Sequence, residues 1–466
     1  MKKRIVLGLC AAALCGAIGA QVPQGLAGEP MPDEWAVDEG IFDQTLPAED
    51  GWWRGFGDGT LDSLVSLAMQ QNLDVETALL RIEQARAGML IQQGGLMPSI
   101  GIGGGWTRQQ TSGNTGSEAS WSGQYSLNAS MTWELDLFGR IRKQVGAQRE
   151  LYRASEEEYR GVMVSLCAEV ALAYFNLRQY QMEREVLEHN CESQLAVVRL
   201  TEARYSSGLA SRLDVAQAQQ VYYGTLAQLP AMKANIVHTM NRLAVLLGQY
   251  PQDVVEGLEA PAPLPDYIEP VQVGVPAGLL LCRPDIRQAE RQVNAQAALL
   301  GAARREWFPR FFLNGSIGYA STEVKHLLKA GSVAWEIAPS MSWTLFNGGQ
   351  RYHTVEQNRA QLDEAIASFN ATVLQAMQEA TDAMATYSHS IEQIVATRQA
   401  FNYSQQALTL SLDLYKQGLT TFQSVLDAQR SLLSSEESLV QARGASLASL
   451  VRLYKALGGG SPLQLP

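Results

Sequence analysis

The chain has 466 residues, which is enough for two or three ordinary domains. With 46% hydrophobic and 18% charged residues, its composition is that of a folded protein and not of a membrane protein built from many helices. The formal net charge is −11, and loss of the basic N-terminal residues makes it more acidic. An acidic chain is unsuited to nucleic acid, so we exclude DNA and RNA as partners.

Residues 1–19 have the three parts of a signal peptide: a basic start, an apolar run and small residues before the cleavage site. The alternative is a membrane anchor, but the run is shorter than the ~20 residues that a spanning helix needs. No other apolar run reaches that length, so we expect no transmembrane helix in the mature chain. Cys10 and Cys15 each follow a leucine where acylation requires a small residue, which argues against a lipid anchor. Residues 20–59 are expected to be extended.

The rest of the chain contains a tandem sequence repeat. The segment YSSGLASRLDVAQAQ (205–219) returns in altered form as YKQGLTTFQSVLDAQ (415–429), at an offset of 210 positions. At the same offset, MTWELDLFGR (131–140) aligns with MSWTLFNGGQ (341–350). This self-similarity predicts a first repeat over residues 60–250 and a second over 277–460. A proline-rich linker (251–276) joins them, and a short tail (461–466) follows.

Each repeat is expected to contain a helix, two strands, a long helix, a turn and a return helix. The predicted strands cover 98–110 and 121–137 in the first repeat, and 309–321 and 333–346 in the second. From residue 121 to residue 137, apolar and polar side chains alternate, which predicts one apolar and one polar face. The run is much longer than the ~5–6 residues of a typical soluble strand and fits a transmembrane β-strand. The expected membrane-interface aromatics are Trp121, Tyr125, Trp133, Trp335 and Trp343.

Four strands are too few to close a membrane barrel, since the smallest barrels have about eight. A bilayer offers no water to unpaired backbone groups, so an open sheet edge there costs several kcal/mol for each group. The strand pattern therefore predicts an oligomer in which several chains contribute to one barrel.

The long helices are expected to form coiled coils about 100 Å long, because each spans roughly 65 residues. In the second repeat, apolar residues recur seven positions apart at Val373, Ala380, Tyr387, Ile394, Phe401, Leu408 and Tyr415. Gly208 and Gly418 are expected to end the long helices in turns, with hairpin tips at about 205–214 and 415–424. The return helices are expected over 214–247 and 424–457.

No set of residues suggests an enzyme. The histidines are scattered and show no metal-ligand spacing, and the glycines at 101–105 lack the helix start that a phosphate-binding loop needs. Met377 and Met384 fit a helix seam better than a metal relay. We therefore expect no catalytic residue, no cofactor and no metal site.

In combination and order, WELDLFGRIR (133–142), CRPDIRQAERQVNAQAAL (282–299) and YKQGLTTFQSVLDAQRSLL (415–433) resemble the TolC-like outer-membrane efflux factors. The nearest branch works with resistance-nodulation-division pumps. The resemblance implies an α+β membrane protein that forms a homotrimer, with a 12-stranded transmembrane β-barrel in the outer membrane and a coiled-coil α-helical tunnel in the periplasm. It also implies two protein partners, a periplasmic adaptor (membrane fusion protein) and an inner-membrane pump.

The resemblance further implies a periplasmic gate near the second tip. Tyr415 and Asp427 match the family pattern, with Asp427 as the carboxylate that rings the tunnel end. Lys416 stands where arginine is common, and Asp214 is its candidate partner. A carboxylate ring favours cations over anions. The alternative for Asp427 is an ordinary solvated carboxylate beside Arg430.

The sequence therefore predicts a passive, gated outer-membrane channel that exports small molecules in a tripartite efflux system. Two alternatives remain open at this point: the exit duct of a type I protein secretion system, and a periplasmic coiled-coil scaffold without a pore. The sequence names neither the exported substrate nor the pump class.

Overall fold

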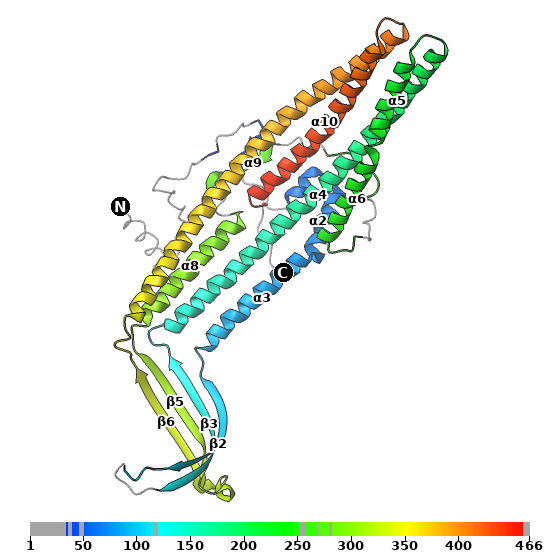
Figure 1. Ribbon diagram of the computed structural model, residues 1–466. Coiled ribbons are helices and arrows are strands. Elements are labelled where there is room, and N and C mark those ends of the chain that lie inside the picture. The colour runs from blue at the N-terminus through cyan, green and yellow to red at the C-terminus, as the bar shows by residue number, and fades with distance from the viewer. Residues whose placement is uncertain are drawn as a thin grey trace.

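The computed structural model describes residues 34–35, 40–45, 51–114, 120–251, 258–265, 267, 270–278 and 282–459. The predicted signal peptide and C-terminal tail lie outside the described residues. The molecule is elongated, with a β-sheet at one end, a long helical body, and two helical hairpin tips at the other end (Figure 1).

The sheet has four antiparallel strands in the order β2 (Ser99–Gln110), β3 (Trp121–Leu135), β5 (Arg310–Ser321) and β6 (Val333–Ser342). Strand β3 pairs with β5, so the two halves of the chain share one sheet. Strands β3 and β6 end at Leu135 and Ser342, before the expected residues 137 and 346. In the first case the backbone N–H of Leu137 turns back to the carbonyl of Leu135 at 2.8 Å, which ends the ladder.

The register of the sheet is continuous, so alternation sorts the side chains onto two faces. One face is almost entirely apolar and includes Ile100, Ile102, Trp106, Tyr125, Leu127, Met131, Leu313, Ile317, Tyr319, Trp335, Ile337 and Met341. The opposite face is mostly small or polar and includes Thr107, Gln124, Ser126, Asn128, Ser130, Asn314, Ser316, Glu336 and Ser340. On the apolar face, Ile102 is 82% exposed and Trp335 is 71% exposed. An apolar surface of this extent marks a face that contacts lipid or protein.

The body is built around two helices of 67 residues each, α4 (Arg140–Ser206) and α9 (Gln350–Lys416). At 1.5 Å per residue each is about 100 Å long. Helix α4 packs against α8 (Pro284–Arg305), and α9 packs along α10 (Phe422–Ala456). Helix α4 is the one described helix long and apolar enough to cross a membrane. Most of its apolar window is buried inside the fold, so it is a core helix.

The first helix of the first repeat is not continuous, contrary to expectation. It is divided into α2 (Gly59–Gln71) and α3 (Leu73–Gly94) at Asn72. The side-chain oxygen of Asn72 accepts hydrogen bonds from the backbone N–H groups of Asp74 and Val75 and so caps α3. Its amide also donates to the carbonyl of Leu246 at 2.8 Å, which fixes the break against the end of the return helix.

The return helix of the first repeat is also divided, whereas that of the second repeat is one helix, α10. The break separates α5 (Arg212–Leu226) from α6 (Leu229–Leu246). Pro230 lies in the first turn of α6, where its missing N–H does no harm, but it cannot continue a preceding helix. The expectation of one helix over 214–247 was therefore wrong.

The N-terminal segment was expected to be extended, but its described part adds to the core. A 3-10 helix, η2 (Trp52–Phe56), buries Trp52, Trp53 and Phe56. The ring of Trp52 stacks on that of Tyr454 near the end of α10, with centroids 5.2 Å apart. Strand β1 (Phe42–Asp43) pairs with β4 (Val271–Gln272) in the linker. The remaining 3-10 helices are η3 (Pro276–Gly278), η4 (Val324–His326) and η5 (Ala330–Ser332).

Candidate functional site

The two hairpin tips have the same backbone turn. Gly208 and Gly418 both have φ +74°, in the left-handed region that favours glycine. After each glycine, the next backbone N–H turns back to the last helical turn: Leu209 donates to Arg204 at 2.8 Å, and Leu419 donates to Leu414 at 2.9 Å. These bonds satisfy carbonyls that the helix end leaves free. The side chains of Leu209 and Leu419 are about two-thirds exposed.

The first tip holds Asp214 in a capping box. The hydroxyl of Ser211 accepts a hydrogen bond from the backbone N–H of Asp214 at 3.2 Å. The Asp214 carboxylate in turn accepts from the backbone N–H of Ser211 at 3.2 Å. This reciprocal arrangement stabilises the start of α5. In the second tip, Thr421 is the N-cap residue of α10, and its side chain makes no capping hydrogen bond.

Tyr415 lies in a small core that joins the two tips. It is 5% exposed, and its ring packs against Phe422 with centroids 5.3 Å apart. Burial raises the pKa of Tyr415, as does the nearby charge of Asp214, while Arg204 acts in the opposite direction.

Arg204 is the contact that the sequence analysis missed. Its guanidinium lies 4.8 Å from the ring centroid of Tyr415 and donates a hydrogen bond to the carbonyl of Lys416 at 3.1 Å. Arg204 of the first hairpin thereby provides a hydrogen-bond donor for a free carbonyl at the C-terminus of α9, the long helix of the second hairpin. The equivalent position in the second repeat is Leu414, and this difference between the copies was the available signal.

Within one chain, the predicted pair between Lys416 and Asp214 is not formed. The ammonium of Lys416 lies 3.2 Å from the carboxylate of Asp413 on its own helix, with both side chains more than half exposed. Asp427 accepts a hydrogen bond from Gln423 at 2.9 Å and is also exposed. A role for Lys416 and Asp427 in a gate therefore depends on a second chain and stays a prediction.

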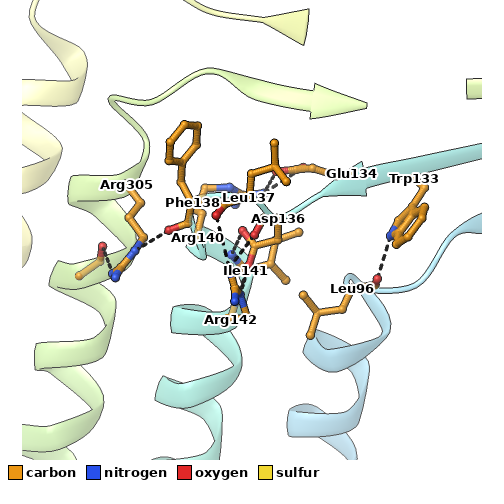
Figure 2. A network of polar contacts seen from close by, with 11 residues as sticks. Leu96, Trp133, Glu134, Asp136, Leu137, Phe138, Arg140, Ile141, Arg142 and Arg305 are labelled. Atoms are coloured by element: carbon orange, nitrogen blue, oxygen red, sulfur yellow. Dashed lines mark hydrogen bonds and ion pairs between the residues drawn. The ribbon is translucent and has the colours of Figure 1, made fainter. Parts of the chain in front are cut away.

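The opposite end of the body contains a polar network where strand β3 passes into helix α4 (Figure 2). Gly139, at φ +76°, makes the turn, and Asp136 caps the helix. Its carboxylate accepts from the backbone N–H groups of Ile141 at 3.1 Å and Arg142 at 2.9 Å. Arg140 completes the network by donating two hydrogen bonds to Glu134, at 2.9 and 3.1 Å.

The pKa of Asp136 reflects this network. Burial acts to raise the pKa of its carboxyl, but the backbone N–H groups and the guanidinium of Arg142 outweigh burial and hold the pKa below its usual range. In the second repeat the corresponding turn uses a neutral amide, since the backbone N–H of Arg351 lies 3.5 Å from the side-chain oxygen of Asn347. The two junctions thus share a shape but not a charge.

Two of the predicted interface aromatics attach the sheet to the helices. The indole N–H of Trp133 donates to the carbonyl of Leu96 at 2.9 Å (Figure 2), and that of Trp343 donates to Trp307 at 3.0 Å. The two tryptophans are 210 positions apart and make the same contact in the two repeats. Trp121 and Tyr125 lie toward the far end of the sheet, and Trp335 pairs with Ile317.

The described residues offer no metal centre, since no three His, Cys, Asp or Glu side chains among them are placed to hold an ion. The geometry instead combines a sheet with an exposed apolar face, a helical body about 100 Å long and a turn-tipped far end. These features define a channel subunit that spans an outer membrane.

The comparisons with known proteins identify the family. The model of the family described as "Outer membrane efflux protein" matches residues 64–249 and again 275–459, and the chain belongs to this family. A probable efflux pump outer membrane protein of Pseudomonas putida, TtgC, is 32% identical over 448 residues, covering 95% of this chain and 90% of that protein. Outer membrane protein OprJ of Pseudomonas aeruginosa is 31% identical over 92% of this chain and 90% of its own length.

Among solved structures, the outer-membrane channel OprN has a TM-score of 0.87 at 31% identity, covering 92% of this chain and 97% of that chain. The family resemblance, the outer-membrane location and the efflux function predicted from the sequence are confirmed. The chain is an outer-membrane efflux channel protein, and its family is one of transport ducts and not of enzymes.

Replacing Arg204 by Leu, the residue at the equivalent position of the second repeat, should loosen the second tip. The variant loses one hydrogen bond and one cation–π contact, together about 1–2 kcal/mol. Amide hydrogen exchange of residues 408–426, followed by mass spectrometry, should become roughly 5–30 times faster. Arg212→Leu changes an exposed arginine near the same tip; it is the control and should leave exchange unchanged. Equal amide exchange rates in Arg204→Leu and the wild type would show that the contact of Arg204 with Tyr415 and Lys416 does not stabilise the tip.

The charge of Asp136 should make stability depend on pH. Because its folded-state pKa is below the unfolded value of about 3.9, the stabilisation is present above that value and is lost as the pH falls through the folded pKa. Between pH 7 and pH 3, the thermal midpoint should fall further for the wild type than for Asp136→Asn. At pH 7 the variant should be less stable by about 1.5–3 kcal/mol. Asp74→Asn, at an exposed position on α3, is the control, and parallel pH curves for Asp136→Asn and the wild type would contradict the assignment.

Proposed function

We propose that three copies of this chain form one continuous export duct. Each chain supplies four strands, so three would close a 12-stranded barrel, and the two repeats of each chain would supply similar parts of a helical tunnel. The observation that carries the proposal is the four-stranded sheet, with its exposed apolar face and two outer edges. Along β2 and β6, no strand of the described chain pairs with the outer edge. In a membrane these edges require partner strands from other chains.

The polar face of the sheet would then line the barrel. It presents amides and hydroxyls, such as Gln124, Asn128 and Ser316, which suit a water-filled lumen. The junctions at Asp136 and Asn347 carry each chain directly from this lumen into the long helices. A solute leaving the helical body would thus enter the barrel without crossing lipid.

The exported compounds are proposed to be small molecules. Relatives of this chain have names that include toluene, solvent and antibiotic efflux pumps. These names favour a small-molecule system over the exit duct of a protein secretion system. A scaffold without a pore leaves the exposed apolar face of the sheet unexplained. The proposed partners are a periplasmic adaptor and an inner-membrane pump, which would meet the duct from the side of the hairpin tips.

The proposed gate is the second hairpin tip, with Asp427, Tyr415, Lys416 and Asp214 as its residues. In a trimer, the exposed Asp427 side chains would be repeated three times around the tunnel axis. Such a ring attracts cations and repels anions. The contact between Arg204 and the buried Tyr415 would hold the two hairpins of one chain together while the tips of different chains separate.

Conductance in planar lipid bilayers tests both the duct and its gate. The wild type should give channels of low conductance with a preference for cations. Asp427→Asn should reduce that preference and keep the hydrogen bond from Gln423, whereas Asp427→Ala should also raise the conductance by weakening the closed tip. Asp363→Ala removes an exposed carboxylate of α9 far from the tip in sequence and is the control. No channel activity in the wild type would refute the duct, and unchanged selectivity and conductance in both Asp427 variants would refute the gate.

A further inference from the structure

The apolar face of the sheet carries one charged side chain along its four strands. Alternation and register place Arg108 of β2 on this face, two residues beyond Trp106. The other charged residues of the four strands, Glu134, Arg310 and Glu336, lie on the polar face. A charge on a face that otherwise meets lipid is costly unless it lies at the level of the headgroups.

The depth of Arg108 corresponds to that level. It is nine residues beyond Ser99, the start of β2 beside the helical body. At ~3.4 Å per residue, this distance is about 31 Å along the strand. A tilt of 35–45° reduces it to about 22–25 Å along the membrane normal, close to the ~25 Å apolar band of outer-membrane barrels. Arg108 therefore lies at the interface farther from the helical body.

Aromatic rings hold the guanidinium of Arg108 in place. In the register, Arg108 is opposite Gly123, so no side chain stands between it and the next aromatic residue on that strand. The guanidinium carbon lies 5.2 Å from the ring centroid of Trp121. Next to this pair, the rings of Trp106 and Tyr125 are stacked, with centroids 6.2 Å apart. Trp106 is 57% exposed and Trp121 is 65% exposed, so broad ring surfaces remain open.

The chemistry of this cluster fits one kind of ligand. A guanidinium presents a planar fork of N–H donors that matches a phosphate group. Among the described residues, no carboxylate forms an ion pair with Arg108. The exposed indole rings offer flat apolar surfaces with a polar N–H, which suits the faces of a sugar ring. We propose that Arg108, Trp106 and Trp121 bind the phosphorylated sugar headgroup of a membrane glycolipid.

This proposal rests on the sheet being part of a membrane barrel, as in the proposed function. The occupant follows from charge complementarity: a single cation faces the level at which anionic lipid headgroups lie. It also follows from continuity, since the site extends the lipid-facing surface and shares its outward direction. Bound lipid at this position would fix the height of the barrel in the membrane.

Native mass spectrometry of the purified protein in detergent tests the site, with diphosphoryl lipid A as the probe. The wild type should retain the glycolipid, and Arg108→Gln should bind it about tenfold more weakly. Lys325→Gln is the control, because Lys325 is a cation of the neighbouring loop that is already paired with Glu323 at 2.7 Å. It should bind like the wild type. Equal binding by Arg108→Gln and the wild type would overturn the proposal.

Three further ligands test separately whether the phosphate and the sugar of lipid A are needed for binding, and whether the site binds a free anion. Dephosphorylated lipid A should bind the wild type as weakly as lipid A binds Arg108→Gln, and undiminished binding would overturn the role of phosphate. Phosphatidylglycerol should bind more weakly than lipid A, and equal binding would overturn the role of the sugar. Inorganic phosphate at millimolar concentration should not displace lipid A, since displacement would indicate a site for the free anion.

The same samples keep this inference apart from the proposed function. Arg108→Gln should still form trimers and conduct in planar bilayers, because its side chain faces away from the lumen. Loss of lipid binding with intact conductance supports the site. If the wild type forms no pore, the proposed duct is refuted. If it forms a pore but binds glycolipid equally well without Arg108, only the proposed lipid site is refuted.

Discussion

Backbone hydrogen bonding at the edges of the sheet is the constraint on which this structure depends. In water the outer edges of β2 and β6 could be solvated, but in hydrocarbon each unpaired N–H or C=O group costs several kcal/mol. The apolar face of the sheet places the strands in hydrocarbon, and the four strands of one chain cannot satisfy their own edges. The strand pattern therefore predicts the assembly of several chains.

The junctions between strands and helices join the four-stranded sheet directly to the long helices, as the proposed duct requires. Asp136 caps α4 directly after β3, and Trp133 attaches the same strand to the end of α3. Trp343 repeats the tryptophan contact in the second half of the chain. The sheet is thus attached to the helices through both halves of the chain, at its end beside the helical body. Movement is then expected mainly at the hairpin tips, where small cores such as that of Tyr415 hold the helices together.

Much of the architecture could be predicted because it follows from side-chain periodicity. Alternation along β3 gave its two faces, and the heptads around Tyr387 gave the long helix α9. The break at Asn72 was missed because it depends on a contact with the distant Leu246. The break at Pro230 was missed because the apolar periodicity continues on both sides of this one proline. At the tip, the turn glycines were visible in the sequence. The difference between Arg204 and Leu414 was visible too, but the role of Arg204 was not, because it depends on the other hairpin lying beside it.

The number of chains in the detergent-solubilised particle tests the central claim most directly. Native mass spectrometry of the wild-type protein measures this number without reference to transport. The account predicts a particle of three chains that needs detergent for extraction, because only partner strands can satisfy the edges of β2 and β6. A stable particle of one chain, released without detergent, would contradict it.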